Sequence, residues 1–148
     1  MCIRDSDGKL YAVGGVNHND DDVLSSVERY DPATNAWEAV ASMGTERWGL
    51  AVAVLEGKVY AVGGYNDGFL NSLERYDPST NEWEAVAPMA EARCKLAVAV
   101  LDGKLYVVGG YNGDRLSSVE RYDPVTNAWE AVAPMASARM DGFAVSWM

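Results

Sequence analysis

The feature that most constrains the fold of this chain is an internal repeat. One tryptophan recurs at a constant interval of 46 residues, at Trp37, Trp83 and Trp129. A pair of glycines precedes each tryptophan, at Gly14 and Gly15, Gly63 and Gly64, and Gly109 and Gly110. The glycine pairs step by 49 and then by 46 residues, and the extra residues lie in the loop after the first pair. A constant period with one loop of variable length is typical of repeat architectures, in which each unit packs on its neighbours.

Within one unit the pattern predicts four short strands. Two apolar runs, Gly49–Leu55 and Lys58–Gly64, flank a Glu-Gly turn. Asn71–Tyr76 alternates between apolar and polar residues, Asp77–Asn81 is a proline turn, and the segment around Trp83 closes the unit. The runs are too short for helices, and glycine and proline interrupt them too often. We therefore predict an all-β chain of antiparallel four-stranded units.

The first strand of a unit is apolar on both faces, which indicates that a sheet covers each face. Ala51 and Ala53 lie on one face, and Val52 and Val54 lie on the other. Such strands need cover on both sides, and radially packed blades with the first strand innermost provide it. The glycine pairs end the second strand, where φ turns positive or backbone comes close. One tyrosine and one tryptophan per unit fill the wide outer gap between blades: Tyr30 and Trp37, Tyr76 and Trp83, Tyr122 and Trp129.

These residues carry a family resemblance. Gly-Gly after an apolar strand, then Tyr76, Trp83, Pro-Met and an arginine, resembles the Kelch motif, over residues 7–148. The stretch LNSLERYDPSTNEWEAVAPM is especially similar to the propellers of BTB–Kelch proteins. Propellers of this family usually close with about six blades. Here the strands suffice for three, so we expect an open arc of a Kelch-type β-propeller unless two copies pair.

The repeat also sets the expected boundaries. We expect a first blade without its inner strand at 7–44, a second blade at 45–90, a third at 91–136, and the inner strand of a further blade at 137–148. Residues 1–6, MCIRDS, match nothing in the repeats, and their codons can resemble a sequencing-library adaptor. One interpretation is a fragment of a longer gene. The alternative is a homodimer that completes a six-bladed ring, with Phe143–Trp147 of one copy completing the blade that begins at Lys9–Val13 of the other.

One face of the arc is the predicted partner-binding rim. In a meander, the loops after the second strand share a face with the segments that precede the first strand, and these parts vary between units. In BTB–Kelch propellers this face generally receives a partner peptide. The resemblance carries the contact role to Trp48, Tyr65, Asn66, Phe69, Cys94, Lys95, Tyr111, Asn112, Arg115, Met140 and Asp141. Tryptophan, tyrosine and arginine commonly anchor interfaces. Arg47, Arg93 and Arg139 recur in every unit, so we predict a structural role for them.

Composition argues against several other functions. The net charge is -10, which disfavours nucleic acid and anionic membranes as partners, and no apolar run reaches the roughly 20 residues of a membrane span. His18 is the only histidine and lies in an acidic loop, so we expect no metal, no cofactor and no catalytic site. Cys2 and Cys94 form no disulfide framework, which favours a reducing, cytoplasmic setting.

The function that the resemblance implies is protein–protein interaction. We expect the substrate-recognition propeller of a BTB–Kelch ubiquitin-ligase adaptor, which would engage a cullin only through an upstream BTB domain. The alternative is a bacterial or extracellular Kelch protein that binds glycans or acts as a scaffold. A Kelch enzyme such as a sugar mutarotase is the remaining alternative, and an open arc is poorly suited to enclosing its substrate.

Overall fold

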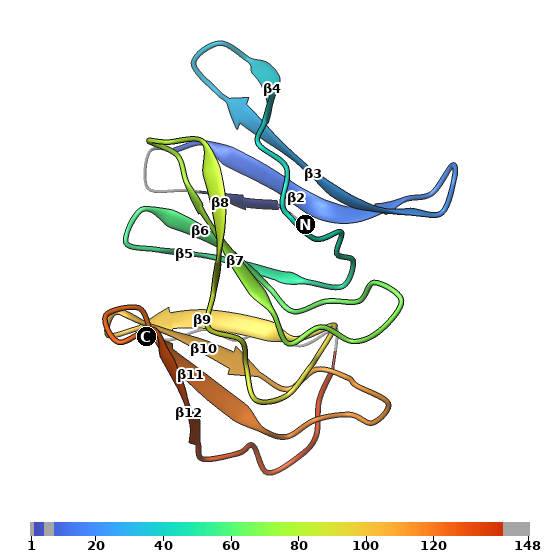
Figure 1. Ribbon diagram of the computed structural model, residues 1–148, viewed down its shortest axis with the longest axis vertical. Helices are drawn as coiled ribbons and strands as arrows, with labels where there is room; N and C mark the ends of the chain where they lie inside the picture. Colours follow the sequence, from blue (N-terminus) through green and yellow to red (C-terminus); the bar gives the residue numbers. More distant parts are fainter. Residues whose placement is uncertain (1, 5–7, 141–148) are drawn as a thin grey trace.

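The computed structural model describes residues 2–4 and 8–140, and these form three four-stranded antiparallel sheets (Figure 1). The first sheet contains β1 (Cys2–Arg4), β2 (Leu10–Asn17), β3 (Asp22–Asp31) and β4 (Ala36–Val40). The second contains β5 (Ala51–Leu55), β6 (Lys58–Val62), β7 (Leu73–Asp77) and β8 (Glu82–Val86). The third contains β9 (Ala97–Leu101), β10 (Lys104–Val108), β11 (Val119–Asp123) and β12 (Ala128–Val132). The prediction of an all-β chain of four-stranded meanders is confirmed.

Two kinds of tight turn produce the meander. Between the first two strands of the second sheet, Glu56 and Gly57 both have positive φ, at 52° and 74°. This is the backbone twist that a two-residue hairpin turn requires. Between the last two strands, the Asp77 carboxylate accepts a hydrogen bond from the Ser79 amide at 2.9 Å, a side-chain turn that aspartate favours. These local signals explain why each repeat folds back on itself every few residues.

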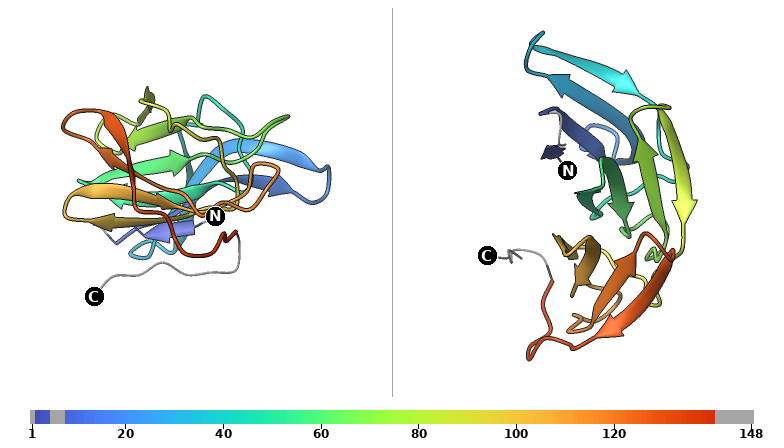
Figure 2. Two further views of the ribbon diagram at one scale, coloured as in Figure 1. Left: turned by 90° about the horizontal axis from the view of Figure 1, so that it is seen from below. Right: turned by 90° about the vertical axis from the view of Figure 1, so that its left-hand side faces the viewer.

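The three sheets stand side by side as blades along an arc (Figure 2). The inner strands β1, β5 and β9 line the concave side, and β4, β8 and β12 lie on the outside. The inner strands of neighbouring blades contact each other. Two apolar cores fill the gaps between blades. The first core includes Tyr11, Val13, Val59, Ala61 and Tyr76, and the second includes Ala51, Tyr60, Val62, Leu105 and Tyr122. Tyr76 and Tyr122 therefore pack between blades, as predicted. The prediction is wrong for Tyr30 and Trp37, which lie outside both cores, because no described blade packs against that face of the first sheet.

Residues 7–44 supply three strands of the first blade, and the inner edge is occupied by Cys2–Arg4, from the segment 1–6 that was set apart from the repeats. β1 pairs with β2, with Ile3 opposite Tyr11. The exposed amide and carbonyl groups of an edge strand pair with any extended segment, whatever its side chains. Backbone pairing therefore says nothing about whether residues 1–6 are an added segment. It does mean that the inner edge of β2 already has a partner.

The first loop after the glycines also differs from the prediction. In the first blade the ladder of β2 and β3 continues past the glycines, with a bulge between Val13 and Gly15, until Asn17 pairs with Asp22. The three extra residues of this loop allow the two strands to extend as a hairpin. In the other two blades the second strand ends before the glycines, at Val62 and Val108, as predicted. The strand expected within 137–148 falls largely on Asp141–Met148, outside the described residues.

Candidate functional site

The loops that follow the second strands lie on one side of the arc, at the right of Figure 1. Two short antiparallel bridges join these loops to the segments that precede the inner strands. Trp48 and Tyr65 exchange backbone hydrogen bonds of 3.2 and 2.8 Å, and Cys94 and Tyr111 exchange two of 2.9 Å. The prediction that these loops and the segments after the repeated arginines share one face is confirmed. We call this face the rim and define it by residues 48–49, 65–69, 94–95 and 111–115.

A row of four aromatic rings crosses the rim from the second blade to the third. The ring centroids are 5.8 Å apart for Trp48 and Tyr65, 5.2 Å for Tyr65 and Phe69, and 5.7 Å for Phe69 and Tyr111. Tilted and edge-to-face arrangements at these separations are favourable for aromatic pairs. All four side chains are half-buried, so each is fixed by its neighbours and still faces solvent. The row is therefore a preorganised apolar surface.

Two cationic side chains flank the aromatic row. The Lys95 ammonium lies 5.7 Å from the centroid of the Trp48 ring, within the range of a cation–π contact. Arg115 is exposed and forms a backbone bridge with Tyr111. These cations stand out because the whole chain carries a net charge of -10. The exposed Asp67 and Asp114 lie on the same rim, so the rim combines apolar rings with charged side chains of both signs.

The other residues predicted to contact a partner differ in their exposure and in their roles. The Asn66 amide donates to the Gly68 carbonyl and the Asn112 amide to the Asp114 carbonyl, so both residues shape the loop turns. Cys94 is only 2% exposed, and its predicted role as a contact residue is wrong, because its side chain lies beneath the rim. Met140 is half-buried, and Asp141 lies outside the described residues.

Arg47 ties neighbouring blades together beneath the rim. Its side chain is fully buried and donates to the carbonyls of Gly63 and Ser72, each at 2.9 Å, and to the Glu74 carboxylate at 3.0 Å. Its own carbonyl accepts a hydrogen bond from the Gly15 amide of the first blade at 2.7 Å. Burial lowers the pKa of Arg47, and the Glu74 carboxylate opposes this effect. One residue therefore connects the first blade to the second.

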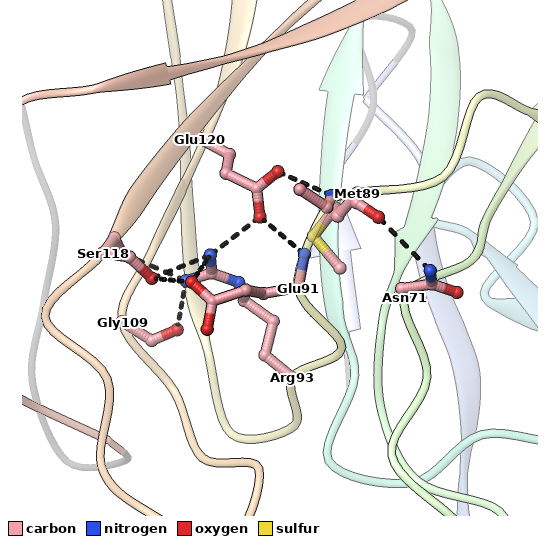
Figure 3. A network of polar contacts seen from close by, with 8 residues as sticks. Asn71, Met89, Glu91, Arg93, Gly109, Ser118 and Glu120 are labelled. Atoms are coloured by element: carbon pink, nitrogen blue, oxygen red, sulfur yellow. Dashed lines mark hydrogen bonds and ion pairs between the residues drawn. The ribbon is translucent and has the colours of Figure 1, made fainter.

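Arg93 repeats this tie between the second and third blades (Figure 3). It donates to the Gly109 carbonyl at 2.8 Å and to the Glu120 carboxylate at 2.8 Å. Glu120 also accepts a hydrogen bond from the Ala90 amide at 2.7 Å. The predicted structural role of the repeated arginine is confirmed at these two positions. The sequence reasoning missed the acceptor glutamates, although Glu28, Glu74 and Glu120 recur at the same interval of 46 residues as the tryptophans.

The described residues also lack a metal-binding cluster and a membrane-spanning helix. Within 8–140, no group of three or more histidine, cysteine, aspartate or glutamate side chains is placed to hold a metal ion. His18 is exposed at the tip of the first hairpin. No helix in the described part of the chain has the length and apolarity to cross a membrane.

Blades that recur in register, with a glycine pair after each second strand and a tyrosine–tryptophan pair at each of the two junctions, define a segment of a repeat-built β-propeller. The chain belongs to the Kelch-repeat family, because the KLHDC2/KLHL20/DRC7 Kelch-repeats domain matches residues 1–145.

Two curated relatives illustrate this membership. The chain is 41% identical to human Kelch-like protein 31 over 71 residues, which cover 45% of this chain and 11% of that protein. It is 42% identical to the mouse influenza virus NS1A-binding protein homolog over 66 residues, which cover 45% of this chain and 10% of that protein. The matched stretches thus span about a tenth of the length of these relatives.

A solved structure shows the same fold. The structure of YjhT superposes with a TM-score of 0.78 at 22% sequence identity. The superposition covers 94% of this chain and 52% of that chain. The three blades described here therefore correspond to about half of that Kelch propeller.

Proposed function

We propose that the chain is a protein-interaction module that binds a partner peptide on its rim. The observation that carries the proposal is the half-buried aromatic row, which runs from Trp48 to Tyr111 across two blades. Aromatic side chains provide contact area at low conformational cost and are common at the centres of interfaces. A peptide that lies along this row would contact both blades at once.

The aromatic row sets the class of peptide. Lys95 and Arg115 flank the row, and the exposed Asp67 and Asp114 lie on the same rim, so positive and negative side chains balance there. Contact with the rings, rather than net charge, would therefore select the ligand. The preferred partner is a peptide with aromatic or aliphatic anchors. No catalytic step forms part of this function.

A peptide selection tests this proposal. Phage-displayed peptides are selected on the immobilised chain, and the recovered peptides are titrated against Phe69→Ser and Tyr111→Ser. We expect each substitution to weaken binding at least tenfold, because either change interrupts the row. The matched control is Val125→Ser, which removes an apolar side chain that is 86% exposed in the turn before β12, away from the rim.

Two outcomes would overturn the proposal. Selected peptides could bind the rim variants as well as the wild type, which would place their site elsewhere. Alternatively, a glycan array could show binding that depends on Phe69 when no peptide is recovered, which would favour the glycan-binding class of Kelch protein.

The specific role that we propose is substrate recognition for a BTB–Kelch ubiquitin-ligase adaptor. The similarity to Kelch-like proteins supports this role, although the matched stretches cover about a tenth of their length. The flanking sequence of the native gene provides the test. A BTB domain encoded upstream, and co-purification of the full-length product with a cullin, would support the adaptor role. A secretory signal peptide upstream would exclude it.

A further inference from the structure

The loops after the glycine pairs of the second and third blades have the same length but differ in the residue that follows their asparagine. Asn66 is followed by Asp67, whereas Asn112 is followed by Gly113. In both loops the main-chain amide of the asparagine donates to the carbonyl two residues further on, at 3.0 Å and 3.2 Å. The two asparagines therefore have the same main-chain setting and different successors.

An asparagine that precedes a glycine has a side-chain amide that the main chain can attack. The nucleophile is the main-chain nitrogen of the following residue, and the bond that it forms closes a five-membered ring. A Cβ on the following residue crowds this approach, and glycine has none. Of the eight asparagines in the chain, Asn112 is the one that precedes a glycine.

The surroundings of Asn112 leave the approach open. Gly113 is exposed and has φ at 110°, and a Cβ built on it would meet nothing within 4 Å. The Asn112 side chain forms no hydrogen bond with any residue that the structure describes. Its amide carbon can therefore rotate toward the Gly113 nitrogen without the loss of a contact.

Four other asparagine side chains are held in place. Tyrosine hydroxyls donate to the side-chain oxygens of Asn35, Asn81 and Asn127 at 2.9, 2.9 and 2.8 Å. The side-chain nitrogen of Asn71 donates to the Met89 carbonyl at 3.3 Å. Each of these side chains would have to break a hydrogen bond before it could turn toward the main chain. Asn112 thus differs from them both in its successor and in its freedom to rotate.

We propose that Asn112 is a site of spontaneous deamidation in the folded protein, with water as the co-reactant. The Gly113 nitrogen gives its proton to a solvent base and attacks Cγ of Asn112. The side-chain nitrogen takes up a proton from solvent and leaves as ammonia, which gives a succinimide. Water then opens the ring at one of its two carbonyl carbons. Opening at Cγ gives aspartate, and opening at the main-chain carbon gives isoaspartate, in which the chain continues through Cγ.

Either product changes the rim at the end of the aromatic row. A carboxylate replaces a neutral amide beside Tyr111, whose ring packs against that of Phe69. Isoaspartate also adds a methylene group to the main chain between Tyr111 and Arg115, which are joined by a backbone bridge. The added group lengthens the loop that this bridge closes. The reaction belongs to the chain itself and is independent of what the rim binds.

Peptide mapping by mass spectrometry tests the proposal on the intact, folded chain. The protein is kept for several days in mildly alkaline buffer at body temperature and is then digested with trypsin. Cleavage after lysine and arginine places Asn112 in the peptide 105–115 and Asn66 in the peptide 59–75. A sample digested at the start corrects for deamidation during digestion. We expect Asn112 to be converted to aspartate and isoaspartate at least tenfold faster than Asn66, because Asp67 carries a Cβ.

Substitutions in the two loops test the cause. Asp67→Gly should raise the rate at Asn66 at least tenfold, and glycine suits the positive φ of 54° at this position. The matched control is Asp67→Ala, which removes the same charge but keeps a Cβ, and it should leave Asn66 slow. Asn112→Gln should abolish the reaction at position 112, because the longer side chain would have to close a six-membered ring. Circular dichroism verifies that each variant is folded.

Three outcomes would overturn the proposal. Asn112 could remain unmodified in the folded chain, or it could react no faster than Asn66. It could also react only when the chain is unfolded in urea, which would show that the folded loop prevents the attack.

Discussion

The first and second blades have similar amino-acid sequences, but their equivalent residues have different surroundings. Glu74 is 7% exposed and accepts hydrogen bonds from Arg47 and from two backbone amides, whereas Glu28 faces solvent. Trp83 packs against the preceding blade, and Trp37 is 49% exposed. A repeat residue therefore stabilises this fold only through the neighbour that it contacts. Stability in such proteins is approximately a sum of unit terms and nearest-neighbour terms.

The same contrast applies to the apolar side chains. Val59 of the second blade is fully buried, and Leu10 at the same position of the first blade is 37% exposed. Fully burying a side chain of this size contributes about 1.5–3 kcal/mol. A central blade gains this on both faces and a terminal blade on one. The loss of stability caused by the same substitution at equivalent positions should therefore depend on whether a neighbouring blade contacts the residue.

The largest difference in the loss of stability is expected between Glu74→Ala and Glu28→Ala. Removing Glu74 leaves the buried Arg47 guanidinium without its carboxylate, which should lower the free energy of unfolding by about 3–5 kcal/mol. Removing the exposed Glu28 should change it by less than about 0.5 kcal/mol. Urea unfolding followed by tryptophan fluorescence measures both, at a concentration at which the chain is monomeric. Equal losses for the two variants would contradict this account of the blade junction.

A second difference in stability between the two blades is expected for substitutions at the second glycine of each pair. Gly64 and Gly15 share a backbone conformation that disfavours any residue with a Cβ, with φ at 105° and 102°. A Cβ at Gly64 would lie 2.9 Å from the Trp48 carbonyl oxygen, and one at Gly15 would meet nothing within 4 Å. Gly64→Ala should therefore cost about 1–3 kcal/mol more than Gly15→Ala, because only the former is overpacked. Thermal unfolding of the two variants measures the difference, and identical melting temperatures would exclude the crowding.

A smaller difference is expected for the outer tryptophans. Trp83→Phe removes an indole that donates to the Ala41 carbonyl, and this should cost about 1 kcal/mol in addition to the lost ring contact. Trp37→Phe removes no such hydrogen bond in the monomer and should be nearly neutral. Denaturant midpoints of both variants provide the measurement. A larger loss for Trp37→Phe in the monomer would show that the first blade has a contact that its exposure does not reveal.

The repeat made most of the fold predictable because its spacing is a property of the whole unit. The glycine pairs mark the ends of strands and the turn residues mark reversals of the chain. Both features are local and do not depend on distant residues. The inner strand of the first blade was missed for the opposite reason. Cys2–Arg4 shares no sequence with β5, and the register of its pairing with β2 is a backbone property that the repeat pattern does not encode.

The rim was predictable in position and less so in detail. Strand order placed Trp48 beside Tyr65 without knowledge of any side-chain contact. The edge-to-face row through Phe69 depends on loop conformations that one sequence does not specify. Cys94 was assigned to the surface because its position in the repeat matches that of Trp48, but a small apolar thiol turns inward where the larger indole remains half-exposed.

The smallest difference concerns acid stability in the outer turns. Hydrogen bonds from the Ser79 hydroxyl and amide lower the pKa of Asp77 below its ordinary value of 3.8. In the first blade the Ala33 amide lowers the pKa of Asp31 without a hydroxyl to assist it. A depressed carboxyl pKa stabilises the fold above pH 3.8, and the contribution is lost as the pH falls through the folded-state value. Ser79→Ala should raise the pKa of Asp77 toward 3.8, and Ala33→Ser should lower that of Asp31. Carboxyl chemical shifts followed by NMR from pH 6 to pH 2 measure both, and unchanged midpoints would show that the hydroxyl does not stabilise the turn.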